Sequence, residues 1–309
     1  MIKGLAITPP ILGRISIGRM VLKDGKRLPE KDDQFTITSQ VQTKDGWVNH
    51  PLDEELRKQA PNGKIRSIPV RMLFNDPDLN LRAEYSMFDR QSGRPICVGN
   101  GETCRRYTEN GIETLPCPSP DYCSLAKNNM CKPYGRLNVN IGDDDELGTF
   151  IFRTTGYNSI RSLAARLSYY QAVSGNLLSC LALQLRLRGK STTQSHRSAI
   201  YYVDLTVREG ITLEQAIVDA HATDDQRKQS GYDQDALDQA GRIGLSNAAF
   251  EFSEDEIPEV LEEFYTNEEN QDAYSIAQAH ATNPSTASGR PSLKQKLEQK
   301  SANLSHHAA

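Results

Sequence analysis

The stretch GRLNVNIGDDDELGTFIFRTTGYNSIRSLAARLSYYQAV, residues 135–173, contains the most clearly defined succession of elements in the chain. Residues 135–141 and 149–154 predict two strands, and the glycines Gly142 and Gly148 at the ends of the acidic run between them are typical of a hairpin loop. Residues 158–173 predict a helix, because apolar side chains recur on one face. These side chains are Ile160, Leu163, Ala164, Leu167 and Tyr170. Two strands followed by an amphipathic helix indicate an α+β fold.

The regions on both sides of this stretch add further strands. Upstream, residues 11–18, 35–38 and 65–74 alternate or are rich in β-branched side chains, and each run ends near a turn signal. Downstream, residues 181–188 alternate leucines with other residues, and residues 199–207 are the expected partner strand across a polar loop at 189–198. We therefore expect a β-rich body over residues 1–210.

The last third of the chain has a different composition. Residues 212–222 and 235–242 predict helices that contain little aromatic mass, so we assign residues 211–248 to a helical extension. From residue 249 to 309 the sequence is acidic and then rich in small polar side chains, which cannot offset the entropy of ordering. We expect this tail to be disordered.

No apolar run approaches the roughly 18 residues of a membrane span, and the N-terminus has no secretory signal pattern. These features predict a cytoplasmic protein, and association with DNA is a second expectation. Collagen-like, rod-like and integral membrane proteins are excluded by composition.

The formal charge of −4 conceals an asymmetry. Residues 1–210 carry 29 Lys and Arg against 22 Asp and Glu, a net +7, whereas residues 211–309 carry 7 against 18, a net −11. A basic body favours contact with nucleic acid, although a solvated surface with an acidic tail explains the same balance.

Five of the six cysteines lie within 35 residues: Cys97, Cys104, Cys117, Cys123 and Cys131. In a cytoplasmic protein such a cluster favours metal binding over disulfides. The surrounding proline-rich segment has no core of its own, and four thiolates around a structural Zn²⁺ would cross-link it. We predict Cys104, Cys117, Cys123 and Cys131 as ligands, with Cys97 as the alternative; unrelated free thiols are the other interpretation. Cys180 lies in an apolar setting and is interpreted as a core residue.

Several motifs resemble a known family, in the same order along the chain. They are GRISIG at 13–18, LPEKDDQFTIT at 28–38, CRR at 104–106, LPCP at 115–118, CKPYGRL at 131–137, LGTF at 147–150 and GYNS at 156–159. Over about residues 10–210 the chain resembles the recombination directionality factor-like proteins of phages, which act with large serine integrases. The resemblance implies a zinc-bearing, non-enzymatic partner of DNA recombination, which would act in the cytoplasm of a bacterial cell.

The full-length chain is also similar to proteins that integrative and conjugative elements carry beside homologous-recombination genes, where they bear the label "hydrolase or metal-binding protein". Such elements use several kinds of recombinase, so this similarity does not imply that an integrase is the partner.

Catalytic motifs are not apparent in the sequence, and we predict no catalytic residue. A G-x-S-x-G motif, an H-E-x-x-H motif and a P-loop are all missing, and an all-cysteine zinc site is normally closed. Residues 143–146 are four consecutive acids that could bind Mg²⁺, but a solvated hairpin loop explains them better. His50, which precedes Pro51, is interpreted as a turn residue.

For nucleic acid, we predict phosphate contacts by basic side chains near the cysteines, on the helix and on the loop at 189–198. The candidates are Arg105, Arg106, Lys132, Arg136, Arg161, Arg166, Lys190, His196 and Arg197. Ordinary surface charge is the alternative for each of them.

The leading functional hypothesis is a non-enzymatic, zinc-binding accessory factor in DNA recombination of a phage or mobile element, which binds a recombinase, DNA or both. A metal-dependent hydrolase or nuclease is the first alternative, and an interaction module of single-strand annealing machinery is the second. Nothing in the sequence points to a membrane or to a small-molecule substrate.

Overall fold

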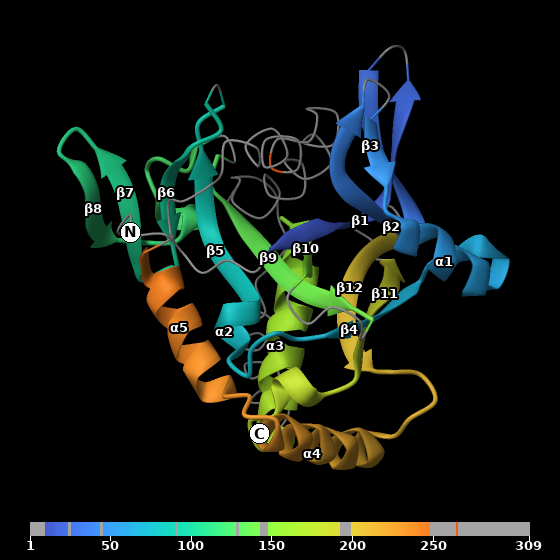
Figure 1. Cartoon of the computed structure of the whole chain (residues 1–309). Coiled ribbons are helices and arrows are strands. Elements are labelled where there is room, and N and C mark those ends of the chain that lie inside the picture. The colour runs from blue at the N-terminus through green and yellow to red at the C-terminus, as the bar shows by residue number, and fades with distance from the viewer. Residues whose placement is uncertain are drawn as a thin grey trace, which may run out of the picture. The chain divides into compact units, whose positions relative to one another are not determined.

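The computed structural model describes residues 10–23, 26–43, 46–90, 92–127, 130–142, 148–191 and 199–247, together with Phe264 (Figure 1). The strands are β1 (Ile11–Lys23), β2 (Lys26–Thr43), β3 (Gly46–Asn49), β4 (Ser67–Arg71), β5 (Leu81–Phe88), β6 (Pro95–Gly99), β7 (Thr103–Thr108), β8 (Gly111–Pro116), β9 (Lys132–Ile141), β10 (Thr149–Thr154), β11 (Leu183–Ser191) and β12 (Ala199–Val207). The helices are α1 (Pro51–Gln59), α2 (Pro77–Asn80), α3 (Tyr157–Val173), α4 (Leu213–Gln229) and α5 (Gln234–Asn247), with short 3-10 turns η1 (Pro61–Gly63), η2 (Pro120–Tyr122) and η4 (Leu178–Cys180).

Nine of these strands form one continuous path in the order β3-β2-β1-β10-β9-β5-β6-β7-β8. The β9–β10 hairpin lies in its middle, and β10 pairs parallel with β1, so that Ile15 lies opposite Phe152. A second group of strands branches from β9 through β4, which pairs with β11, and β11 pairs with β12. The antiparallel β6–β7–β8 strands therefore form one end of the path (Figure 1).

The main hydrophobic core is shared by both groups of strands and by α3. Phe35 on β2, Leu137 on β9 and Leu185 on β11 all belong to it, and α3 contributes Leu163 and Leu167. The Oγ of Ser159 on α3 accepts a hydrogen bond of 3.1 Å from the backbone N–H of Val203 on β12. Apolar side chains spaced four apart on α3 thus meet alternating side chains of the strands, as the sequence pattern predicts.

The two C-terminal helices pack against the body. Ala216 and Ala220 of α4 are fully buried in the main core. On α5, the Asp238 carboxylate accepts hydrogen bonds from the backbone N–H groups of Asn75 (3.3 Å) and Asp76 (3.1 Å), just before α2. Because the buried side chains of α4 are small, this helix packs closely against the body although it contains little aromatic mass.

The β-rich, α+β character predicted from the sequence is confirmed, as are the strands near residues 135–141, 149–154 and 199–207 and the helix at 158–173. The predicted helices at 212–222 and 235–242 are confirmed and are longer than expected. Residues 249–263 and 265–309 of the predicted tail lie outside the described residues, whereas Phe264 is buried. Within the described residues, no helix is both long and apolar enough to cross a membrane.

Candidate functional site

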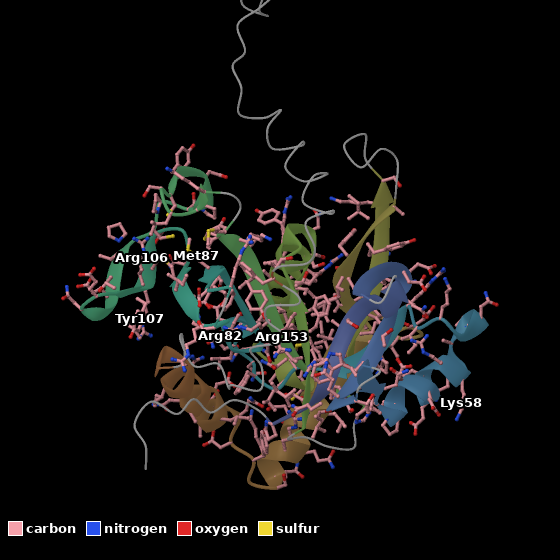
Figure 2. All side chains as sticks on the ribbon, turned by 90° about the horizontal axis from the view of Figure 1, so that it is seen from above. Lys58, Arg82, Met87, Arg106, Tyr107 and Arg153 are labelled. Atoms are coloured by element: carbon pink, nitrogen blue, oxygen red, sulfur yellow. The ribbon has the colours of Figure 1, made fainter. Side chains whose placement is uncertain are left out.

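The cysteines at one end of the sheet gather around β6 and β7. Cys97 on β6 lies opposite Arg106 on β7 and opposite Met87 on β5, while Cys104 lies opposite Gly99. Alternation along a strand places Cys97, Cys104 and Arg106 on one face. Figure 2 shows Met87 and Arg106 at this end of the sheet. The buried side chains of Met87, Cys97 and Cys104 form a small apolar cluster.

The remaining thiols approach this cluster from the loop between β8 and β9. Cys117 follows β8, where its backbone N–H donates to the carbonyl of Glu102 at 2.8 Å. Cys131, directly before β9, packs on the same cluster as Cys117. Cys123 lies in a turn after η2, and none of the six cysteines forms a disulfide.

Gly99 permits the closest approach within this cysteine cluster, which we define as Cys97, Cys104, Cys117, Cys123 and Cys131. A Cβ added at position 99 would lie 2.6 Å from the Cβ of Cys104 and 3.0 Å from the Sγ of Cys117. Real Cβ atoms essentially never show the first distance, and the second is tighter than nine in ten real Cβ contacts. The backbone of β6 therefore has room for two cysteine side chains only because residue 99 has none.

We expect Gly99→Ala to lower the free energy of unfolding by about 1–3 kcal/mol, because the added methyl must displace β7 or the Cys117 loop. Urea unfolding is the measurement. Gly189→Ala on β11 is the matched control, since the nearest atom there is the edge of the Tyr201 ring at 3.3 Å, which can rotate away. If both variants unfolded at the wild-type urea concentration, the close packing of Gly99 against the cysteines would be wrong.

The electrostatics of the cysteine cluster disfavour thiolates in the absence of a cation. Burial, together with the hydrogen bond and charge of Cys97, raises the pKa of Cys104 to about 11. Burial and the charges of the four other clustered thiols raise the pKa of Cys131 to about 12. The guanidinium of Arg106 lies 3.9 Å from the Cys104 Sγ, and its pKa is raised chiefly by a hydrogen bond to Cys97.

Four of the five predicted candidate ligands, Cys97, Cys104, Cys117 and Cys131, thus pack on one apolar cluster, and the charge of Cys123 acts on Cys131. As they stand, however, no three His, Cys, Asp or Glu side chains in the described ranges are placed so that they could hold a metal ion. The acids at 143–146 lie outside the described residues. Zinc binding at the cysteine cluster therefore stays a prediction.

The β7–β8 hairpin beside the cysteines presents apolar side chains to solvent. Tyr107 and Ile112 lie opposite each other across the two strands and are 65% and 46% exposed. Tyr122 in η2 is 84% exposed, and Leu125 is also exposed. Figure 2 shows Tyr107 on this outer hairpin. We define Tyr107 and Ile112 as the hairpin surface.

The predicted phosphate contacts do not share one face. Lys190 donates a hydrogen bond of 2.8 Å to Asn158, and Arg161 is exposed on α3. Lys132 donates to the backbone carbonyl of Phe264 at 3.0 Å. Arg105 and Arg106 lie on β7, Arg136 lies on β9, and His196 and Arg197 lie outside the described residues.

Arg166, another predicted phosphate contact, takes part in an internal ionic network. The Asp204 carboxylate on β12, with a side chain only 7% exposed, pairs with Arg166 at 3.1 Å and with Arg188 at 3.3 Å, and it accepts a hydrogen bond from Ser162 at 2.9 Å. Burial alone would raise the pKa of Asp204, but these hydrogen bonds and positive charges hold it below its ordinary value. Sequence analysis did not identify Asp204, although an acid between Val203 and Leu205 in an apolar strand was a usable signal.

His50, predicted to be a turn residue, is the N-cap of α1. Its Nδ1 accepts a hydrogen bond of 3.3 Å from the backbone N–H of Leu52, and its ring lies edge-on to Phe150 at 5.0 Å between centroids. Burial lowers the pKa of His50. A neutral imidazole that caps a helix has a structural role.

Comparison with known proteins identifies one related family. The Gp3-like model, described as recombination directionality factor-like, matches residues 12–208, from the start of β1 to the end of β12. The match includes the cysteine cluster and the hairpin surface. Neither the curated proteins nor the solved structures contain a significant match.

Proposed function

Since this chain belongs to the recombination directionality factor-like family, we propose that it is a non-enzymatic accessory factor in DNA recombination of a phage or mobile element, which acts by binding a recombinase, DNA or both. The observation that carries the proposal is the family match, which extends over the whole β body with its cysteine cluster and hairpin surface. The alternatives, a metal-dependent hydrolase or nuclease and an annealing module, are outcomes of the experiments below.

The first part of the proposal is that the cysteine cluster binds one structural Zn²⁺. Thiolate sulfur is the ligand that Zn²⁺ prefers in structural sites, and such sites use four ligands. Cys97, Cys104, Cys117 and Cys131 pack on one apolar cluster, and burial together with the charges of neighbouring thiols raises the pKa values of Cys104 and Cys131. A divalent cation would reverse both effects, and Cys104, Cys117 and Cys131 with either Cys97 or Cys123 would hold it. Its contribution would be to cross-link β6, β7 and the loop before β9.

The second part is that the hairpin surface contacts the recombinase. Aromatic and apolar side chains at the exposed end of a sheet are typical of protein interfaces, where tyrosines contribute a large share of the binding energy. Tyr107 and Ile112 lie on β7 and β8, next to the cysteine cluster, so a metal there would hold the hairpin in one orientation. Net positive charge on the body favours an additional, sequence-independent contact with DNA phosphates.

The double variant Tyr107→Ser/Ile112→Ser should lower the affinity for the recombinase of the parent element by about tenfold or more, because two side chains at the centre of the interface are truncated. Capture of that purified recombinase by the immobilised full-length chain is the measurement. Tyr157→Ser on α3, which is 58% exposed, is the matched control and should bind as the wild type does.

An unchanged affinity of the double variant would contradict the hairpin surface as the contact. The functional alternatives are tested with labelled oligonucleotides and the same protein. Strand cleavage that requires Mg²⁺ would favour a nuclease, and faster pairing of complementary strands would favour an annealing module. Neither activity is expected from an accessory factor.

A further inference from the structure

Three arginines form a row across the middle of the sheet. Arg82 on β5 lies opposite Arg136 on β9, and Arg136 lies opposite Arg153 on β10. Residues directly opposite each other in antiparallel strands point to the same face and are about 5 Å apart. Figure 2 labels Arg82 and Arg153 over these central strands, on either side of β9. We call Arg82, Arg136 and Arg153 the arginine row.

This row concentrates positive charge at a buried place. The side chains of Arg82 and Arg136 are 13% and 12% exposed, and Arg153 is 6% exposed. Among the ion pairs of the described residues, Glu84 contributes one carboxylate to the row, at 3.6 Å from Arg82 and 3.8 Å from Arg136. Burial and the charge of Arg136 lower the pKa of Arg82 to about 10. Like charges directly opposite each other are destabilising, so this face of the sheet is complementary to a negatively charged segment.

A residue of the C-terminal third is anchored at the end of this row. Phe264 is 1% exposed and packs edge-to-face on Phe88 (4.8 Å between centroids) and on Tyr134 (6.0 Å). Tyr134 precedes Arg136 by two residues on β9, and the Arg136 guanidinium lies 5.7 Å from the Tyr134 ring. The backbone carbonyl of Phe264 accepts a hydrogen bond from the Lys132 Nζ. Phe264 therefore fixes this part of the chain against Tyr134, two residues along β9 from Arg136.

The residues that lead to Phe264 carry charge of the opposite sign to that of the arginine row. Residues 251–263, which we call the acidic segment, contain seven Asp and Glu and no Lys or Arg. A chain covers at most about 3.5 Å per residue, so the two glutamates directly before Phe264 are within reach of the row. Phe264 thus fits the aromatic pair on this face of the sheet, and the negative charge of the acidic segment is complementary to the arginine row.

We infer that the arginine row is the docking surface for the chain's own acidic segment, which Phe264 fastens to the Phe88–Tyr134 pair. Glu262 and Glu263 compensate the buried guanidinium groups, and the contact covers the row against other polyanions. The acidic segment is then an internal ligand of the basic body. This inference does not depend on zinc binding or on the recombinase as partner.

The test is cleavage of the full-length protein by a glutamate-specific protease. Cleavage within residues 251–263 is compared with cleavage after Glu209, an exposed residue in the loop between β12 and α4. Phe264→Ala and the double variant Arg82→Gln/Arg153→Gln should each accelerate cleavage in the acidic segment by about fivefold or more, because proteolysis follows the population of the open form. The rate after Glu209 should not change. Lys228→Gln, on the exposed side of α4, is the matched charge control.

A second measurement uses the wild-type protein and does not depend on the folding of any variant. Between about 0.01 M and about 1 M NaCl the Debye length falls from about 30 Å to about 3 Å, so the relative cleavage rate in the acidic segment should rise. Acceleration by Phe264→Ala but not by the arginine variant or by salt would overturn the inference, since Phe264 would then pack without the charge contact. Equal rates in all proteins would also overturn it.

Discussion

Full-length protein purified without chelators should contain about one Zn²⁺ per chain, and Cys104→Ser and Cys131→Ser should both lose it. Burial and neighbouring thiols raise the pKa of Cys104 to about 11 and that of Cys131 to about 12, so both thiols are protonated at neutral pH when no cation is bound, and nothing then cross-links the segment. Binding free energy at a structural zinc site is folding free energy. Loss of the metal should therefore destabilise the protein by several kcal/mol and open residues 97–131 to proteases first.

Metal analysis of each variant and limited proteolysis are the measurements. Cys180→Ser is the matched control, because Cys180 lies in the main core and should leave the zinc content unchanged. Cys97→Ser and Cys123→Ser decide the fourth ligand, since only the variant at the ligand position should lose zinc. Metal-free wild-type protein whose stability equals that of Cys104→Ser would show that the cysteines are unrelated free thiols.

Asp204→Asn should lower the free energy of unfolding at neutral pH by about 2–3 kcal/mol. The variant removes the one charge that Arg166 and Arg188 share, and breaking a buried ion pair typically costs about 3–5 kcal/mol. The lower value applies because both arginine side chains are more than 40% exposed and can be resolvated by water. Urea unfolding measures the difference.

The pH dependence of this difference provides a second check. The pKa of Asp204 is lowered in the folded protein, so the unfolded chain binds the proton more readily. The stability that Asp204 contributes is therefore present above about pH 4 and is lost as the pH falls through the folded-state pKa. Wild type and Asp204→Asn should approach each other in stability below about pH 4. Asp224→Asn, which breaks a surface pair with Lys228, is the control and should cost less than about 1 kcal/mol.

Arg166 was predicted as a phosphate contact because the sequence pattern does not show that Asp204 is its partner. A basic side chain off the apolar stripe of a helix has no partner within its own element, so sequence patterns assign it to solvent or to nucleic acid. Its partner, Asp204, lies 38 residues further along the chain, and the pairing of α3 with β12 brings the two groups together. Arg161, one turn earlier on α3, is exposed as the pattern indicates.

The sequence by itself determined the local elements of this protein. Periodicity located α3 and the strands from β9 to β12, because a helix or strand that buries one face must repeat its apolar residues at a fixed spacing. The motifs between residues 13 and 159 were sufficient to identify the family, and the family match from residue 12 to 208 confirms it. The dense spacing of the cysteines was sufficient to select the segment in which four thiols pack on one cluster.

Only the tertiary structure decided which distant residues become neighbours. The parallel pairing of β1 with β10, the alignment of Arg82, Arg136 and Arg153, and the burial of Phe264 against β5 and β9 all join segments far apart in the chain. Such contacts depend on strand order and register, and a local pattern of apolar and polar residues is compatible with many registers. Phe264 shows this most directly: its surroundings are too acidic to predict a core residue, yet two aromatic rings of the folded sheet provide a site that buries it.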